Sequence, residues 1–427
     1  MKVLIRNGRL IDPQHYIDEK LDILIQGNRI EKIDKHLRPK GDDVQVINAS
    51  HHIVAPGLID VHAHLREPGF EYKETIKTGT MAAAKGGYTS IVCMANTDPV
   101  NDNKSITEHI VKQAKTEGLC RVFPCGAITK GLKGEELAEI GEMYSAGIIA
   151  ISDDGKSVKN ADLLKKAFEY ALLFDIPVIS HCEDEDLSKG YVHEGHASLI
   201  SGLDVIPSIA EEVIVRRDIA IAQYAGAPIH LTHISTSGSV DAINRAKKRY
   251  KKITCDTCPH YFTLTDEATL TFDTNTKVNP PLRSREDVGF IKEGLKNNTI
   301  DIIATDHAPH DLTSKDVEFN IASWGISGLE TALSLSLQLV HEGVLTLNDL
   351  LKKFTVNPAK LLKLPYGQLA PDSIADLIIF NLDIEWVVDK NTFVSKGKNT
   401  PFHGWKLKGK NLFTMVDGRI VYRDPVI

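Results

Sequence analysis

The stretch Leu58-Ile-Asp-Val-His-Ala-His-Leu-Arg-Glu-Pro-Gly69 is the part of the chain around which the rest is organised. The apolar run over residues 53–59 predicts a buried strand, and His62 and His64 come at its end. Side chains on a strand alternate between its faces, so both imidazoles can reach one ion. Arg66 continues the same spacing. The stretch therefore predicts a strand that presents two metal-capable residues and an arginine on one side.

Four further segments place polar residues after apolar, strand-like runs. On its own, an H-x-H pair favours packed or surface histidines over metal ligands. Here the pair is accompanied by Ser152–Asp154, Ser180–Glu183, Thr232–Ser235 and Ala304–His310. Several separate strands thus end in residues that bind metals or transfer protons.

Strand-like runs alternate with helical patterns through the middle of the chain, which favours a parallel sheet. We expect eight strands, ending near Asp60, Met94, Ile128, Asp153, His181, His233, Pro259 and Asp306. Helical spacing of three and four is clear in Leu163, Leu164, Ala167, Phe168, Ala171 and Leu172, and Ser284–Asp287 fits a capping box. Eight strand–helix units predict an α/β fold, a closed (β/α)8 TIM-like barrel over residues 53–365, with its active site where the strands end.

Both ends of the chain predict β structure. Gly27-Asn28 near the start and Asp417-Gly418 near the end each separate two strand-like runs, which is a hairpin signal. Each end alone is too small for a stable core, but barrel closure would bring the two together. We therefore expect residues 1–52 and 366–427 to form one small composite β-sandwich domain.

Composition favours a protein that acts on a small molecule. A length of 427 residues suits one large and one small domain, and a net charge of -7 gives no electrostatic case for nucleic acid or an anionic membrane. No apolar run approaches the roughly 18 residues of a membrane span, and we expect a cytoplasmic protein. The six cysteines are expected to be reduced, and the unaccompanied Cys255 and Cys258 pair is not expected to bind zinc.

Three segments stand outside the alternating pattern. Residues 310–325 show no helix or strand period, and their place at the barrel mouth predicts a lid. Residues 183–207 contain His193 and His196, which we interpret as surface histidines. Residues 396–410 carry five lysines and are interpreted as a solvated stretch.

The strand ends together supply six donors suited to divalent zinc. They are four imidazoles and two carboxylates: His62, His64, His181, His233, Asp154 and Asp306. Six donors exceed the need of one tetrahedral ion. Two ions that share a carboxylate would use them better, at the usual separation of roughly 3.5–4 Å.

These motifs resemble the amidohydrolase superfamily and, within it, the bacterial type I dihydroorotases of pyrimidine biosynthesis. The resemblance runs nearly end to end, through Asp60–Gly69, Lys73–Val100, Ser152–Gly155, His181–Asp184, Val192–Gly195, Thr232–Thr236, Asn279–Ser284, Ala304–His310, Gly328–Thr331 and Ser395–Phe402. Such extended agreement is highly specific.

The resemblance implies two zinc ions per subunit. His62 and His64 would hold one ion, and His181 and His233 the other. Asp154 would bridge the two. Many superfamily members use a carboxylated lysine as the bridge, and an aspartate at this place suits the Asp-bridged type.

The resemblance also implies a catalytic residue and a set of substrate contacts. Asp306 would contact the first zinc and act as the proton carrier. The implied substrate contacts are His64, Arg66, Asn96, Asn279, His310 and the backbone of Trp324 and Gly325. Two departures bear on substrate positioning: Ala95 stands where the family usually has Pro, and Ser323-Trp324-Gly325 replaces Pro-Phe-Gly.

The implied reaction is the reversible, zinc-dependent interconversion of (S)-dihydroorotate and N-carbamoyl-L-aspartate in UMP biosynthesis. Arg66 has the planar fork that binds a carboxylate by two parallel hydrogen bonds. One rival is another cyclic amidohydrolase, an allantoinase or a hydantoinase, whose substrates lack this carboxylate. The other is a catalytically dead structural partner of aspartate transcarbamoylase, although no metal ligand is missing. A homodimer and binding of aspartate transcarbamoylase stay open.

Overall fold

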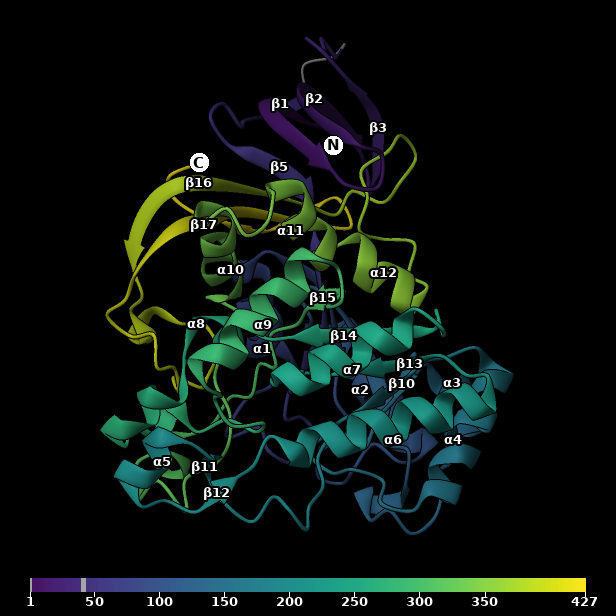
Figure 1. The fold of residues 1–427 in the computed structure, drawn as a ribbon. Helices are drawn as coiled ribbons and strands as arrows, with labels where there is room; N and C mark the ends of the chain where they lie inside the picture. The colour runs from purple at the N-terminus through teal and green to yellow at the C-terminus, as the bar shows by residue number, and fades with distance from the viewer. Residues whose placement is uncertain (1, 40–43) are drawn as a thin grey trace.

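The structure, a computed structural model, describes residues 2–39 and 44–427. A β sheet formed from both ends of the chain lies against a larger unit of strands and helices (Figure 1). Both termini lie in the sheet, as Figure 1 shows. The arrangement confirms the expected α/β barrel with a small β domain built from both chain ends.

Eight parallel strands form the barrel, and each expected strand is present. They are β6 (Leu58–Ala63), β7 (Tyr88–Cys93), β8 (Arg121–Gly126), β9 (Ala150–Ile151), β10 (Val178–Ser180), β13 (Ile229–Leu231), β14 (Ile253–Thr257) and β15 (Ile302–Ile303). They pair in chain order from β6 to β15. The first and last strands meet through a bridge between Ala63 and His307 and through the Thr305 N–H, which donates to Asp60 Oδ1 at 3.0 Å. The sheet therefore nearly closes.

Buried side chains from six of these strands fill the barrel. They are Ile59, Val61, Val92, Cys125, Ala150, Ile179 and Ile302. Such a filled interior leaves the strand ends and the loops after them as the place for a site. The polar residues of interest follow the carboxyl ends of the strands.

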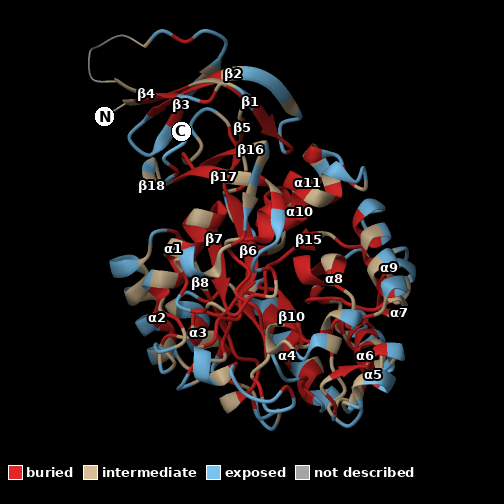
Figure 2. Ribbon diagram, turned by 90° about the vertical axis from the view of Figure 1, so that its left-hand side faces the viewer, coloured by how far each residue is buried: buried red, intermediate tan, exposed pale blue. Residues whose placement is uncertain are grey.

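Helices surround the barrel with their buried faces turned inward and their exposed faces outward (Figure 2). They are α1 (Ile76–Gly86), α2 (Lys104–Glu117), α3 (Ile140–Ala146), α4 (Ala161–Phe174), α5 (His196–Ser201), α6 (Ile209–Ala225), α7 (Ser237–Lys247), α8 (Pro259–Thr263), α9 (Arg285–Lys296), α10 (Ala332–His341), α11 (Leu347–Phe354) and α12 (Val356–Leu362). The expected start of α9 is confirmed, because Ser284 Oγ accepts from the Asp287 N–H at 3.2 Å. Five short 3-10 helices are also described: Lys130–Leu132, Asp266–Thr271, Thr274–Thr276, Leu312–Ser314 and Lys390–Thr392.

The composite sheet joins eight strands among the described residues. They are β1 (Lys2–Asp12), β2 (Ile17–Gln26), β3 (Arg29–Asp34), β4 (Val44–Asn48), β5 (Ile53–Pro56), β16 (Leu377–Val387), β17 (Lys406–Val416) and β18 (Arg419–Arg423). Both expected hairpins, β2 with β3 and β17 with β18, are antiparallel pairs. Hydrogen bonds connect all eight strands into one sheet over a core of its own. A separate two-stranded sheet pairs β11 (Val192–His193) with β12 (Val205–Ile206).

The apolar run over residues 53–59 is two strands, where we expected one. β5 pairs with β1 and β16 in the composite sheet, whereas β6 pairs with β7 in the barrel. The chain passes between the sheets at Gly57, where an added Cβ would lie 2.1 Å from the Thr89 methyl carbon. Both strands are buried, so the run carries no polar break. The division into residues 53–365 and the two flanking segments stays a prediction.

Two segment interpretations are wrong. His193 is buried rather than on the surface, and its Nδ1 lies 3.3 Å from the Arg283 Nη1. Burial, with Arg283 adding to it, lowers the pKa of His193 to about 4. The 396–410 stretch is buried at Asn399 and Thr400, and its end, from Lys406 to Lys410, forms the first part of β17. His196 is exposed as expected.

The remaining expectations concern cysteines and membranes. All six cysteines are free and buried, so none forms a disulfide. In the part of the chain that the structure describes, no helix combines the length and the apolar character needed to cross a membrane.

Candidate active site

The six expected donors converge at the carboxyl ends of the barrel strands. His62 lies on β6 and His64 just beyond it, and His181 follows β10 directly. The loops after β9, β13 and β15 carry Asp154, His233 and Asp306, respectively. All six side chains are buried. Distant parts of the chain thus meet in one small cluster, because parallel strands end at the same rim.

Asp154 lies at the centre of the imidazoles. Its Oδ1 is 3.3 Å from His62 Nε2, 3.5 Å from His233 Nε2 and 3.7 Å from His181 Nδ1. Its Oδ2 is 3.5 Å from His64 Nε2. One carboxylate therefore faces all four rings, which is the position that a bridging ligand needs.

Asp306 lies on one side of this cluster. Its Oδ1 is 3.2 Å from His64 Nε2 and 3.5 Å from His62 Nε2. Two groups of donor atoms, each within 4.8 Å of one another, result: His62, His64 and Asp306, and His62, Asp154 and His233. The division of the histidines between two ions stays a prediction, because His62 belongs to both groups.

The electrostatics of the cluster favour a cation. His62 Nε2 is buried and makes no hydrogen bond with any described residue, although it faces both carboxylates. Burial would lower the pKa of His62, but Asp154 and Asp306 raise it to about 10. Burial would likewise raise the pKa of Asp154, but His62, His181 and His233 hold it well below its usual range. Two carboxylates that face buried imidazoles, one of which has a nitrogen without a hydrogen-bond partner among the described residues, form a donor set that fits divalent zinc.

Partners on the far side of the rings orient two of these histidines. His62 Nδ1 lies 2.7 Å from Thr232 Oγ1, and that hydroxyl donates to Asp256 Oδ2 at 3.0 Å. His64 Nδ1 lies 2.8 Å from Asn96 Oδ1, which fixes Nδ1 as the donor. In both rings Nε2 is left to face the cluster.

Glu183 orients His181 in the opposite sense, and the sequence reasoning missed it. Its Oε2 lies 3.0 Å from His181 Nε2, so Nδ1 is the ring atom that faces Asp154. The same oxygen accepts from Asn279 Nδ2 at 2.9 Å. The signal was present in the sequence, because Glu183 follows His181 at the two-residue spacing used for His62 and His64.

Arg66 reaches the same mouth from the loop after β6. Its Nε donates to Pro309 O at 3.2 Å, and its Nη2 lies 3.3 Å from His310 Nε2. His310 Nε2 donates to Trp324 O at 2.8 Å, so this nitrogen does not accept a hydrogen bond from Arg66. Burial lowers the pKa of Arg66 to about 10, so the guanidinium stays charged at neutral pH. A cationic fork therefore lies beside the six metal-capable donors.

Known proteins resemble this sequence over its whole length. A family model described as dihydro-orotase-like matches residues 51–239. The dihydroorotase of Syntrophus aciditrophicus is 51% identical over 425 residues, which is 99% of this chain and 100% of that protein. The dihydroorotase of Acetivibrio thermocellus is 53% identical over 427 residues and 100% of each chain. The chain belongs to the dihydroorotase family.

Solved structures agree on the fold. The L-hydantoinase (dihydropyrimidinase) from Arthrobacter aurescens matches with a TM-score of 0.89 at 25% identity, over 99% of this chain and 96% of that one. The dihydropyrimidinase from Brevibacillus agri NCHU1002 matches with a TM-score of 0.87 at 24% identity, over 99% and 95%. Both structures therefore share the fold of this chain, and the two dihydroorotases are about twice as similar to it in sequence.

The residues that the sequence reasoning missed in this dihydroorotase-family chain lie mainly at the rim. Lys315 is buried, and its Nζ donates to Ser323 O at 2.6 Å and to Thr274 O at 2.9 Å. Lys277 Nζ donates to Asn320 O at 2.8 Å. Two lysines thereby hold the 310–325 segment through its backbone. Such contacts leave no periodic pattern in the sequence. Closure of this segment as a lid stays a prediction.

The departures from the family pattern fit their surroundings. The Trp324 ring is stacked on Tyr191 with 6.5 Å between centroids, and Lys277 Nζ lies 4.5 Å from its centre. The Gly325 N–H donates to Lys277 O at 2.9 Å. Gly325 has φ +133°, which disfavours any side chain there. Ala95 is fully buried.

Three site residues adopt the left-handed backbone region that non-glycine residues rarely enter. The φ angles are 63° at Arg66, 40° at His233 and 45° at Asp306. Such conformations persist where the surroundings fix them, and they cluster at functional sites. Each lies just after a barrel strand, where the turn aims the side chain into the mouth.

Proposed function

We propose that the chain catalyses the reversible hydrolysis of (S)-dihydroorotate to N-carbamoyl-L-aspartate. One observation carries the proposal: Arg66, which can bind a carboxylate, lies beside four imidazoles and two carboxylates that can hold divalent metal. Dihydroorotate carries one carboxylate outside its scissile amide. The relatives named above as dihydroorotases support the same reaction.

The metal would be zinc, with two ions per subunit. His62, His64, His181, His233, Asp154 and Asp306 would hold it. When bound, zinc would polarise the ring amide carbonyl and lower the pKa of water to about 7. The chain itself supplies ring orientation: Thr232, Asn96 and Glu183 hold His62, His64 and His181 so that one nitrogen of each faces the cluster.

The rim residues would bind and orient the substrate. Arg66 would bind the carboxylate, with Asn96 and Asn279 beside it. His310 Nδ1 is buried and has no partner among the residues that the structure describes. Because His310 Nε2 donates to Trp324 O, Nδ1 is the acceptor and would receive a ring N–H of the substrate. Trp324 and Gly325 would line the same side through their backbone.

Asp306 would carry the proton. Burial would raise its pKa, but the hydrogen bond with His64 and the charge of His62 hold it well below its usual range. The carboxylate is thus ionised and can accept the proton of the attacking water. It would then deliver that proton to the departing ring nitrogen, and microscopic reversibility makes it the donor and acceptor in cyclisation as well.

The test is turnover by the zinc-loaded protein of three cyclic substrates: dihydroorotate, hydantoin and allantoin. We expect ring opening of dihydroorotate and cyclisation of carbamoyl aspartate, with little turnover of the two substrates that lack the carboxylate. Preferred hydrolysis of hydantoin or allantoin would contradict the proposal and support the rival cyclic amidohydrolase. No turnover of any of them, with zinc bound, would support the structural-partner alternative.

The pathway, the cellular location and the partners of the protein are part of the same proposal. The reaction serves pyrimidine biosynthesis, and we propose that it takes place in the cytoplasm. A homodimer and a complex with aspartate transcarbamoylase stay predictions. Sedimentation of the purified chain, alone and mixed with aspartate transcarbamoylase, would test both.

A further inference from the structure

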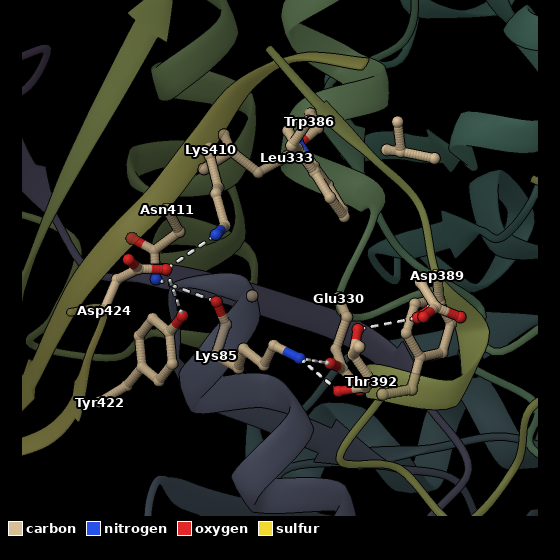
Figure 3. A pocket seen from close by; sticks show the side chains of 14 residues that line it. Lys85, Glu330, Leu333, Trp386, Asp389, Thr392, Lys410, Asn411, Tyr422 and Asp424 are labelled. Carbon is tan, nitrogen blue, oxygen red and sulfur yellow. Dashed lines mark hydrogen bonds and ion pairs between the residues drawn. The ribbon is translucent and has the colours of Figure 1, made fainter. Parts of the chain in front are cut away.

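The segment over residues 393–400 leaves the composite sheet and runs to the barrel mouth. It follows β16, and Figure 1 shows this yellow part of the chain descending beside the barrel. Glu330 Oε1 accepts from the N–H groups of Val394 at 2.7 Å and Ser395 at 3.1 Å. Lys85 Nζ pairs with Glu330 Oε2 at 2.7 Å and donates to Thr392 O at 2.7 Å, as Figure 3 shows. The barrel therefore holds the segment at its start.

The pocket in Figure 3 lies where the start of this segment meets the barrel. Its volume is about 340 Å³, and it lies between α1, α10 and strands β16 to β18. Its two lysines are both paired, Lys85 with Glu330 and Lys410 with Asp424 at 2.8 Å. Each ion pair lies within one part of the molecule, and the hydrogen bond from Lys85 Nζ to Thr392 O joins the two parts.

A second buried carboxylate holds the middle of the segment. Ser395 Oγ donates to Glu74 Oε2, and the Lys396 N–H donates to Glu74 Oε1 at 3.3 Å. Glu74 Oε2 also lies 3.4 Å from His307 Nε2, one residue after Asp306. Gly397 then passes so close to Pro309 that an added Cβ would lie 2.5 Å from the proline Cβ. The segment thus lies directly on the loop after β15.

Asn399 uses every hydrogen-bonding position of its side chain at this point, and it is only 4% exposed. Its Oδ1 accepts from the His310 N–H at 2.9 Å and from Ser327 Oγ at 2.8 Å. Its Nδ2 donates to Ala308 O at 3.0 Å and to Gly325 O at 2.9 Å. One side chain therefore connects the loop after β15 with the far end of the 310–325 segment.

The backbone that Asn399 binds is the backbone that carries the substrate residues. Arg66 Nε donates to Pro309 O, between Ala308 and His310. His310 is itself a partner, and Gly325 follows Trp324, whose carbonyl accepts from the His310 ring. The composite half of the chain thus fixes the relative placement of three proposed substrate contacts.

We propose that Asn399 is a positioning residue for substrate binding, which acts through the backbone of Ala308, His310 and Gly325. The inference rests on the proposed function of those loops. Asn399 touches neither the metal-capable donors nor the proposed proton carrier. Its loss should therefore weaken substrate binding and leave zinc content unchanged.

The test uses Asn399→Asp in the zinc-loaded, full-length protein. The substitution keeps the shape but replaces the two N–H donors with a carboxylate oxygen, which would face the Ala308 and Gly325 carbonyls. We expect KM for dihydroorotate to rise about tenfold or more, with a smaller change in kcat, because uniform binding is lost. Hydrogen exchange should rise in peptides that cover residues 308–310 and 324–327.

Asn381→Asp is the matched control. Asn381 also lies in the composite half and makes four hydrogen bonds, from Nδ2 to His51 O and His52 Nδ1, and at Oδ1 from the N–H groups of Asp383 and Ile384. None of these partners lies at the barrel mouth. We expect both substitutions to lower Tm by a similar amount. KM should rise in Asn399→Asp alone. An equal KM change in the two would overturn the positioning role.

Gly397→Ala keeps the inference testable if Asn399→Asp does not fold. The added methyl group would press the segment away from Pro309 and Ser327, and KM should rise while zinc content is kept. If the unmodified protein turns over dihydroorotate and a folded variant has the same KM, the positioning role of Asn399 is overturned and the proposed function stands. A wild-type protein that binds zinc but does not turn over dihydroorotate would overturn the proposed function instead.

Discussion

The metal-capable floor of the site and the rim above it are assembled in different ways. The floor consists of side chains placed by barrel strand ends, and its four imidazoles lie 3.3–3.7 Å from the Asp154 carboxylate. The rim consists of coil segments that hold one another across long separations, such as the 91 residues between Asn399 and Ala308. Floor residues are defined by their own side chains, whereas rim residues depend on backbone fixed from elsewhere. Loss of a floor residue should therefore remove function, and loss of a rim residue should weaken it by degrees.

The largest effect is expected from Asp154→Ala, which removes the carboxylate that faces all four imidazoles. Bound zinc should be lost and turnover should fall to background, beyond the roughly 10²–10⁴-fold attributed to a single proton-transfer group. Metal analysis and the ring-opening assay measure the two changes. The adjacent Asp153 is the control, because its Oδ1 accepts from the N–H groups of Ile128 and Thr129 instead. Asp153→Asn should keep its zinc, and loss of zinc in both variants would contradict the central place of Asp154.

Asp306→Ala should have the next largest effect and separate chemistry from metal binding. Three histidines and Asp154 would still anchor zinc even if the fourth imidazole were lost. Hydrolysis and cyclisation should both slow by at least roughly 10²-fold, since one group serves both directions. Rates in the two directions are to be compared with zinc content in the same preparation. Retained zinc with near-normal rates would remove Asp306 from the mechanism and point to His310.

Substitution of Arg66 tests the boundary between floor and rim. Arg66→Lys keeps the charge but loses the fork, and Arg66→Met loses both. We expect kcat/KM for dihydroorotate to fall about tenfold in the first variant and about a hundredfold in the second, in line with charge-assisted hydrogen bonds. Zinc content should not change. Normal dihydroorotate turnover by Arg66→Met would show that another residue binds the carboxylate.

The smallest effect is expected from Lys315, which belongs to the rim alone. Burial lowers its pKa to about 7 from the ordinary 10.5, and the charge of Lys277 adds to this. Between these pH values the unfolded chain binds a proton that the folded chain has released, so the stability of the wild type should rise with pH. Relative to Lys315→Met, the free energy of unfolding should increase by about 2 kcal/mol from pH 7 to pH 9. Denaturant melts at several pH values measure this, and a flat difference would mean that Lys315 stays protonated.

The sequence predicts the floor of the site better than the rim. Strand runs alternate with helical runs, so the eight strands, the barrel and the residues at the strand ends followed from periodicity. His62 and His64 share a face by two-residue spacing, the other donors were found at the ends of further strands, and the resemblance supplied the expected role of each. Glu183 obeyed the same spacing and could have been found.

The rim escaped prediction because its contacts have no period. Residues 396–410 looked solvated from their lysines, yet Asn399 lies buried among backbone groups from two other places in the chain, residues 308–310 and Gly325. His193 looked like a surface residue because nothing near it in the sequence announces its contact with Arg283, 90 positions away. The break at Gly57 was hidden because both strands beside it are buried and the run over residues 53–59 is apolar on either side of the glycine. Such features depend on long-range packing, which one sequence does not display.

The most direct test of zinc-dependent catalysis is to remove metal from the protein with a chelator, add zinc stepwise and measure dihydroorotate ring opening at each step. The protein should be inactive without metal, regain turnover as zinc is added, and reach its maximum at about two ions per chain, the number expected for a bridged pair. Asp154→Ala, titrated in parallel, should not recover. Full turnover of dihydroorotate by protein verified to be free of metal would contradict the zinc-dependent mechanism.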